Sequence, residues 1–138
     1  MNPSVELTNA MLRLYESMAS GDANAVISFY SHQSTVLSIG TDSNEWWEGY
    51  AEISQVVKAQ LQEMGGIEMI AGNLKTFVEG NVGWVADCPT IRLPNGEEII
   101  LRLTAVFHKE DESWKIVQRH VSIGKPNLET IGKELTTS

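Results

Sequence analysis

The stretch EEIILRLTAVFHKEDESWKIVQRHVSI, residues 97–123, decides the fold class, because apolar and polar residues alternate along it. In its first part, 97–108, one set of alternate positions is wholly apolar: Leu101, Leu103, Ala105 and Phe107. A period of two is typical of a strand with one buried face. We therefore predict antiparallel strands over 97–108 and 113–123, with the odd positions of the first strand facing a core.

The turn at Glu110-Asp111-Glu112 decides which face the second strand buries. A three-residue loop pairs odd with odd positions and places Arg119 on the core side. A two-residue loop pairs odd with even positions and places His120 there instead. The residues alone leave both registers open.

Two further strands, 67–79 and 82–93, precede this pair. Their separators, Glu79-Gly80-Asn81 and Pro94-Asn95-Gly96, are rich in turn-forming residues. Connections this short join antiparallel neighbours, so we expect a four-stranded meander.

Helices are expected before the strands. One apolar stripe has helical spacing and ends at Gly21: Leu7, Met11, Leu14, Tyr15 and Met18. Asp22 is suited to cap a second, short helix, and Gly65-Gly66 ends a third that begins after Gly49. Between these helices we expect a short strand, 34–39, and a polar loop, 40–49. A short terminal helix follows Asn127. This order predicts a single α+β domain over residues 1–138.

The composition excludes several classes of function. A net charge of −8 disfavours binding to nucleic acids and to anionic membranes. No apolar run approaches the roughly 20 residues of a membrane helix, and the N-terminus does not resemble a secretory signal. A single cysteine, Cys88, rules out an intramolecular disulfide, so we expect a reducing, cytoplasmic setting. No metal-binding or phosphate-binding motif occurs, and we expect no cofactor and no metal.

Several motifs resemble the SnoaL-like branch of the nuclear transport factor 2-like superfamily. They are Ser20-Gly21-Asp22 after the first helix, FYSHQSTVLS at residues 29–38, and WKIVQRHVS at 114–122. The stretch 104–122 is also similar to the association domain of calcium/calmodulin-dependent kinase. The resemblance covers nearly the whole chain in layout. It implies a cystatin-like fold, in which a cone-shaped, curved antiparallel sheet wraps around N-terminal helices, encloses a cavity and pairs in dimers through its outer face.

The resemblance also bears on the register and on the chemistry. Arginines that line the pocket of the kinase association domain would fall on Cys88, Ala105 and Val121, so none is retained. Two of these positions are odd, which favours the odd-with-odd register. The catalytic aspartate of ketosteroid isomerases would fall on Ser38, whose hydroxyl is no base near neutral pH without an activating partner. No catalytic residue is therefore assigned.

The candidate ligand-binding residues are those expected to line the cavity: Tyr15, Tyr30, Trp47, Trp84, Cys88 and Arg119. Arg119 would anchor a carboxylate or enolate, or else pair with a structural acid or extend to the rim. Trp47 lies in the loop before the third helix, and Trp84 shares its parity with Cys88. Asp87, of opposite parity, would face away unless Pro89 marks a bulge.

The far face of the sheet is the expected homodimer interface, because it mixes aromatic and aliphatic residues with few Lys or Glu. Its candidate residues are Thr104, Trp114, Ile116, Gln118 and His120. His120 is either an interface residue or, in the other register, a general base in the cavity.

Two functions remain open. The chain is either a dimeric binding or scaffold domain for a mostly apolar, possibly acidic small molecule, or an isomerase, cyclase or lyase acting on a small hydrophobic ring compound. The absence of an aspartate at position 38 favours the first, whereas a carboxylate in the cavity would favour the second.

Overall fold

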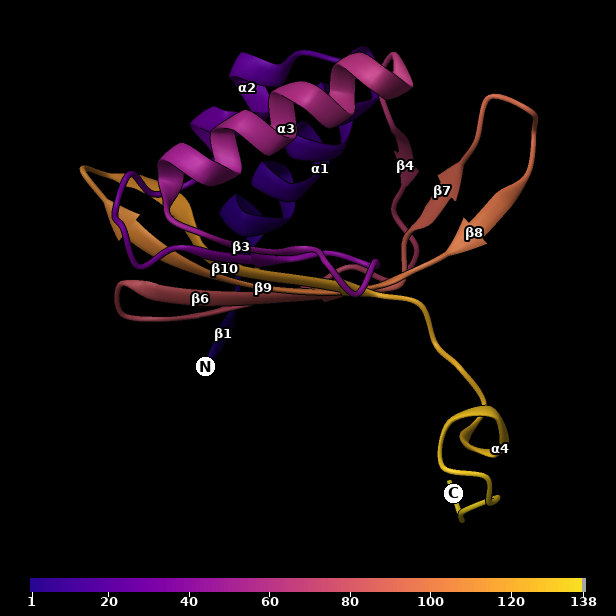
Figure 1. The fold of residues 1–138 in the computed structure, drawn as a ribbon. Coiled ribbons are helices and arrows are strands. Elements are labelled where there is room, and N and C mark those ends of the chain that lie inside the picture. Colours follow the sequence, from indigo (N-terminus) through magenta and orange to yellow (C-terminus); the bar gives the residue numbers. More distant parts are fainter. Residues whose placement is uncertain (138) are drawn as a thin grey trace.

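The computed structural model describes residues 1–137 and places three helices on one side of a curved sheet (Figure 1). The helices are α1 (Val5–Ser20), α2 (Ala23–Ser28) and α3 (Tyr50–Met64), and a short α4 (Asn127–Thr130) follows the sheet. Caps fix the helix ends as predicted: Asp22 accepts a hydrogen bond from the Ala25 amide, and Gly65 has a φ of 69°.

The main sheet has seven strands in the order β1-β5-β6-β9-β10-β2-β3. Their bounds are β1 (Asn2–Pro3), β2 (Leu37–Ile39), β3 (Trp46–Glu48), β5 (Lys75–Glu79), β6 (Val82–Asp87), β9 (Arg102–Glu110) and β10 (Ser113–Ser122). The expected meander is present as β5-β6-β9-β10. β2, however, runs parallel to β10, and the loop 40–49 contains the edge strand β3.

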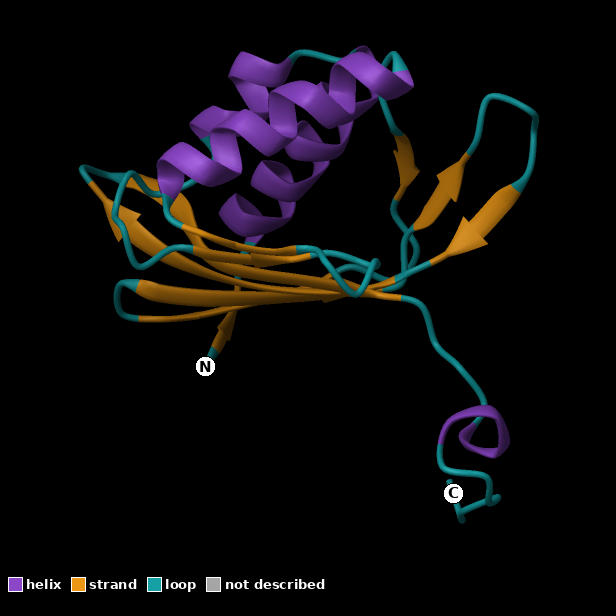
Figure 2. Ribbon diagram, viewed as in Figure 1, coloured by secondary structure: helices purple, strands orange, loops and turns teal. Residues whose placement is uncertain are grey.

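A smaller sheet consists of β4 (Glu68–Ile70), β7 (Thr90–Arg92) and β8 (Glu98–Ile100). It rises from one end of the main sheet on the same side as the helices (Figure 2). The strands predicted over 67–79, 82–93 and 97–108 are therefore each divided in two. The chain leaves the main sheet after Asp87, whose carboxylate binds loop amides, and Pro89, which has no amide hydrogen to donate to a ladder.

The turn between β9 and β10 differs from the favoured prediction. It has two residues, Asp111 and Glu112, with φ of 48° and 64°, so that Ser113 pairs with Glu110 and Ile116 with Phe107. Such left-handed pairs are typical of two-residue hairpins. The odd-with-odd register predicted from a three-residue loop is thus wrong for the first half of β10.

A bulge at Val117 restores the predicted register in the second half of β10. Beyond it, Arg119 pairs with Ala105 and Val121 with Leu103. One extra residue reverses the side to which every later side chain points. Both halves of β10 consequently bury a residue beneath the helices: Ile116 is 0% exposed and Val121 is 2% exposed.

Candidate functional site

Arg119 lies on the helix side of the sheet, as the favoured register predicts. The parallel pairing of β10 with β2 places Arg119 beside Ser38, and Nη1 of Arg119 donates a hydrogen bond to the Ser38 Oγ at 3.0 Å. Ser38 is itself buried. The position where ketosteroid isomerases carry an aspartate is therefore the hydrogen-bond partner of the arginine.

Three adjoining hollows between the sheet and the helices all reach Arg119. The first is a cavity of about 70 Å³ beneath α3, and the second is a larger one of about 150 Å³ toward the small sheet. The third, of about 10 Å³, lies against α1. The first is lined mainly by aliphatic side chains: Leu14, Met18, Val26, Ile53, Val56, Val57, Leu61 and Ile67. Arg119 is thus a cation in largely apolar surroundings.

No carboxylate in residues 1–137 lies within ion-pair distance of Arg119. The bond to Ser38 is its one side-chain hydrogen bond to the described part of the protein. A guanidinium carries five N–H donors, so most of those donors have no protein acceptor. The arrangement leaves a positive charge that a bound anion could pair with.

Tyr30 and Trp47, both predicted to line the pocket, border the first cavity together with Arg119. Tyr30 is 3% exposed. Its hydroxyl makes no hydrogen bond within the described residues. Every fully enclosed side-chain oxygen in these residues has a hydrogen-bond partner, so the Tyr30 hydroxyl is not fully enclosed. The hydroxyl therefore opens to the cavity. Trp47 also borders the second cavity, whereas its neighbour Trp46 is 58% exposed.

The wall of the second cavity has a polar contact that the sequence did not indicate. Gln60 on α3 donates from Nε2 to Oε2 of Glu45 at 2.8 Å, and both residues line the second cavity. Glu45 belongs to the loop between β2 and β3, so this bond joins that loop to α3. The expected polar loop, 40–49, therefore forms part of the cavity wall.

Tyr15 is buried on α1 and donates its hydroxyl hydrogen to Oδ2 of Asp87 at 2.8 Å. Burial, and then the hydrogen bond and charge of Asp87, raise the pKa of Tyr15 well above its ordinary value, against a smaller lowering by Arg119. The expectation that Asp87 faces away from the core is wrong, because Asp87 pairs with Leu103 on the helix side. The Asn73 and Cys88 amides donate to its Oδ1.

Trp84 and Cys88 are not in the cavity, contrary to the prediction. Residues paired across a ladder share a face, and Val85 pairs with the buried Ala105. Trp84 therefore lies on the outer face, where its ring is 6.2 Å from that of Phe77, and Cys88 is exposed. The parity of Val85 was the signal in the sequence that could have placed them.

Two of the residues predicted for the dimer interface also lie elsewhere. Ile116 is fully buried in the core, and Trp114 donates from Nε1 to Glu6 on α1 at 3.0 Å. Both precede the bulge, where the two-residue turn points even positions toward the helices. Thr104, Gln118 and His120 do lie on the outer face and are exposed.

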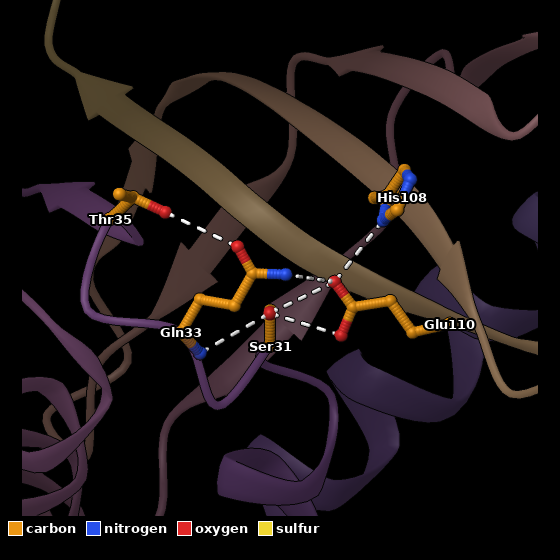
Figure 3. A network of polar contacts seen from close by, with 5 residues as sticks. All are labelled: Ser31, Gln33, Thr35, His108 and Glu110. Carbon is orange, nitrogen blue, oxygen red and sulfur yellow. Dashed lines mark hydrogen bonds and ion pairs between the residues drawn. The ribbon is translucent and has the colours of Figure 1, made fainter.

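A second polar cluster joins the loop after α2 to the end of β9 (Figure 3). The Glu110 carboxylate accepts hydrogen bonds from Ser31 Oγ and Gln33 Nε2, and its Oε2 lies 3.2 Å from the His108 Nδ1. None of these residues lines the hollows around Arg119. Its serine, histidine and carboxylate therefore hold the loop after α2 against the end of β9.

Residues 1–137 contain no group of three or more His, Cys, Asp or Glu placed to hold a metal ion. In the same range no helix is long and apolar enough to cross a bilayer. Chemically, the site offers a guanidinium without a carboxylate partner, two hydroxyls, a tryptophan and the bonded pair Gln60–Glu45 around a largely apolar space.

The model of the SnoaL-like domain family matches residues 7–126. The chain belongs to this family. The match includes Arg119, Ser38 and the other residues of the cavity. Among curated proteins, no sequence matches the chain.

Solved structures of low sequence identity share the fold of this SnoaL-like chain. A nuclear transport factor 2-like protein of unknown function from Pseudomonas putida is 14% identical with a TM-score of 0.78, covering 96% of this chain and 93% of that one. A candidate dehydratase of the same family from Streptomyces avermitilis is 16% identical with a TM-score of 0.76, covering 87% and 94%. A candidate calcium/calmodulin-dependent kinase association domain from Xanthomonas campestris is 18% identical with a TM-score of 0.70, covering 90% and 95%. A nuclear transport factor 2-like protein from Novosphingobium aromaticivorans, 17% identical with a TM-score of 0.70 and covering 86% and 79%, has a cystatin-like fold, which confirms the predicted fold class.

Proposed function

We propose that this protein binds a small, mostly apolar molecule that carries an acidic group. The acid pairs with Arg119 and Ser38, and the apolar part lies against Trp47 and the aliphatic residues beneath α3. The observation that carries this proposal is the Arg119 guanidinium, which lines an apolar cavity with no carboxylate at ion-pair distance in residues 1–137.

The physical argument concerns the free energy of a partly buried charge. Removing a cation from water is costly unless an anion or several acceptors replace the water. A protein carboxylate would supply that compensation in a purely structural site. Here the serine hydroxyl supplies one acceptor, and a bidentate carboxylate would complete the pairing. The free Tyr30 hydroxyl adds a second polar contact in the same cavity.

The dimensions favour a small ligand. The hollows of about 70 and about 150 Å³ are below the range of roughly 300–1,000 Å³ that is typical of sites for drug-sized molecules. A single-ring or short-chain carboxylate suits this space, so benzoate is a suitable probe. Its uncharged analogue, benzamide, has nearly the same shape.

The test compares two arginines of the same sheet. Arg119→Met is expected to weaken benzoate binding by roughly tenfold or more, because a charge-assisted hydrogen-bond pair is lost. Arg102→Met, on the exposed outer face of β9, is the matched control and should leave binding unchanged. Calorimetry and the intrinsic tryptophan fluorescence report the affinity, and native mass spectrometry of freshly purified protein reports any retained molecule. Equal affinity for benzoate and benzamide would contradict the proposal.

We also propose that the protein acts as a cytoplasmic homodimer whose subunits meet through the outer face of the main sheet. Thr104, Gln118 and His120 lie there, together with the aromatic pair Phe77–Trp84. Large aromatic side chains are enriched in such interfaces. The face points away from the cavity, so pairing would leave Arg119 accessible from the mouth.

A specific observation supports the second candidate function, an isomerase, cyclase or lyase. Tyr15 and Asp87 form a buried pair, Tyr15 borders the smallest hollow around Arg119, and one structural neighbour is a candidate dehydratase. We rank this function second because loop amides and Tyr15 occupy both oxygens of Asp87, which does not line the hollows. The carboxylate that does line a hollow, Glu45, accepts a hydrogen bond from Gln60. Incubation of any molecule recovered by native mass spectrometry with the protein decides between the two, since only an enzyme converts it to a product.

A further inference from the structure

The last part of the chain, residues 124–137, is called the C-terminal arm here. It leaves β10 after Ser122 and extends away from the main sheet on the side opposite to the helices (Figure 1). Its backbone hydrogen bonds within the described residues join residues of the arm to one another, as from the Ile131 amide to the Asn127 carbonyl. The arm is therefore not held by its own domain.

The arm exposes three large aliphatic side chains: Leu128 at 58%, Ile131 at 62% and Leu135 at 52%. Leu128 lies in α4 and Ile131, three residues later, is the residue that ends this single turn of helix. A single helical turn has too few hydrogen bonds to be stable alone in water. Both observations indicate that the arm packs against a surface that the monomer does not provide.

The outer face of the main sheet is the second unpartnered apolar surface of the chain. It carries Phe77 and Trp84, with Val82 43% exposed at one end. The arm extends on this same side of the sheet. A second copy of the chain would cover both surfaces at once, whereas an unrelated partner would have to match each separately.

Charge and length fit the same partner. The arm has Lys125, Lys133, Glu129 and Glu134, so it is neutral, and the whole net charge of −8 lies on the rest of the chain. A neutral arm meets no net repulsion from an acidic second copy. Its 14 residues could span up to about 45 Å if extended, which is sufficient to cross a neighbouring sheet.

We propose that the C-terminal arm is an exchange arm, which packs its aliphatic residues on the second copy in the dimer. The proposal rests on the homodimer proposed above and identifies a part of the chain that holds it together. The arm of each copy lies on the other, so two equivalent contacts form about the two-fold axis.

The first experiment measures the dimer dissociation constant of the full chain by sedimentation equilibrium. The double variant Leu128→Ser with Ile131→Ser is expected to raise it roughly tenfold or more, as truncated interface side chains do. Leu12→Ser is the control, because Leu12 is 45% exposed on α1, away from the outer face. If the double variant has the same dimer dissociation constant as the wild type, the arm contact is refuted and the proposed dimer is retained. If the full wild-type chain is monomeric, both the arm contact and the dimer are refuted.

A second experiment shows whether the arm reaches the other copy. Unlabelled and ¹⁵N-labelled full chains are mixed, left to exchange and treated with an amine cross-linker. Lys125 and Lys133 of the arm should then be linked to Lys75, which is exposed on β5. We expect light peptides joined to heavy ones. Links only within one isotope would mean that the arm folds back on its own chain and would overturn the proposal.

Discussion

At the scale of single residues, Tyr15 shows how one hydrogen bond depends on burial. Its hydroxyl is enclosed and donates to Asp87, so ionising it in the folded protein would place two negative charges side by side. Burial is the main cause of the raised pKa of Tyr15, and the hydrogen bond and the charge of Asp87 raise it further. The tyrosine therefore acts as a neutral donor that holds Asp87 in the β6–β7 connection.

Tyr15→Phe is expected to lower the free energy of unfolding by about 1 kcal/mol near neutral pH, the usual contribution of one internal hydrogen bond. Urea unfolding followed by circular dichroism measures the change. Tyr50→Phe is the matched control, because the Tyr50 hydroxyl makes no hydrogen bond within residues 1–137; its ring stacks on His32. Equal effects of both variants would contradict a special role for the Tyr15–Asp87 bond.

The difference between wild type and Tyr15→Phe should also depend on pH. The folded-state pKa of Tyr15 is raised above 10.0, the ordinary value that holds in the unfolded chain. Its contribution to stability is therefore complete below pH 10 and is lost as the pH rises further, because only the unfolded chain then releases the proton. The difference in the free energy of unfolding between wild type and Tyr15→Phe should therefore fall by about 1.4 kcal/mol per pH unit above 10. Urea titrations at pH 8 and pH 11 test this.

The residues of the site show where sequence reasoning is sufficient. The pattern of 113–123 alone left the direction of Arg119 open, and the family resemblance favoured the register that places it on the helix side, where it lies. The orientation of Asp87 was not predictable, because it depends on the pairing of β6 with β9. The favoured family alignment suggested the opposite face. Gln60 and Glu45 meet only through the path of the loop between β2 and β3, which no local pattern encodes.

At the scale of elements, β10 shows how two irregularities combine. The predicted three-residue loop was reasonable, because Glu is disfavoured in the left-handed region that the second position of a two-residue turn requires. The sequence did contain a signal for the bulge. The apolar residues lie at even positions in the first half of the strand, Trp114 and Ile116, and at an odd position, Val121, in the second half. A strand whose apolar residues change parity contains a bulge, and Val117 provides it.

Glu112→Gly should stabilise the protein by roughly 0.5–1 kcal/mol, because glycine adopts the φ of 64° without strain. The ion pair that this change removes is weak: Glu112 is 94% exposed, and its carboxylate lies 3.9 Å from Lys109 Nζ. Glu112→Ala removes the same pair while keeping the strain, so it serves as the control. Thermal unfolding of the three proteins measures the effect, and a glycine variant no more stable than the alanine variant would refute the strain.

At the scale of the whole molecule, the two functions that we propose are assigned to opposite faces of the main sheet. Odd positions of β9 face the helices and the cavity, and even positions face outward. The α+β class followed from the order of helices and strands and from this alternation, whereas the cavity was expected from the family resemblance. The division into two sheets did not, because it depends on where the chain leaves the main sheet after Asp87.

This separation leads to a prediction for the dimer. Thr104→Glu adds an acidic group to the exposed outer face of β9. Two such groups would face each other across the two-fold axis of the dimer, in which each chain already has a net charge of −8. We expect dissociation to monomers by sedimentation, with benzoate affinity at Arg119 unchanged because the cavity lies on the other face. Gln55→Glu adds the same charge on the exposed side of α3 and should leave the dimer intact. A Thr104→Glu protein that stays dimeric would place the interface elsewhere. A Thr104→Glu protein that becomes monomeric and also loses its affinity for benzoate would show that the two faces are coupled. Dimerisation would then be necessary to keep the cavity in its binding shape.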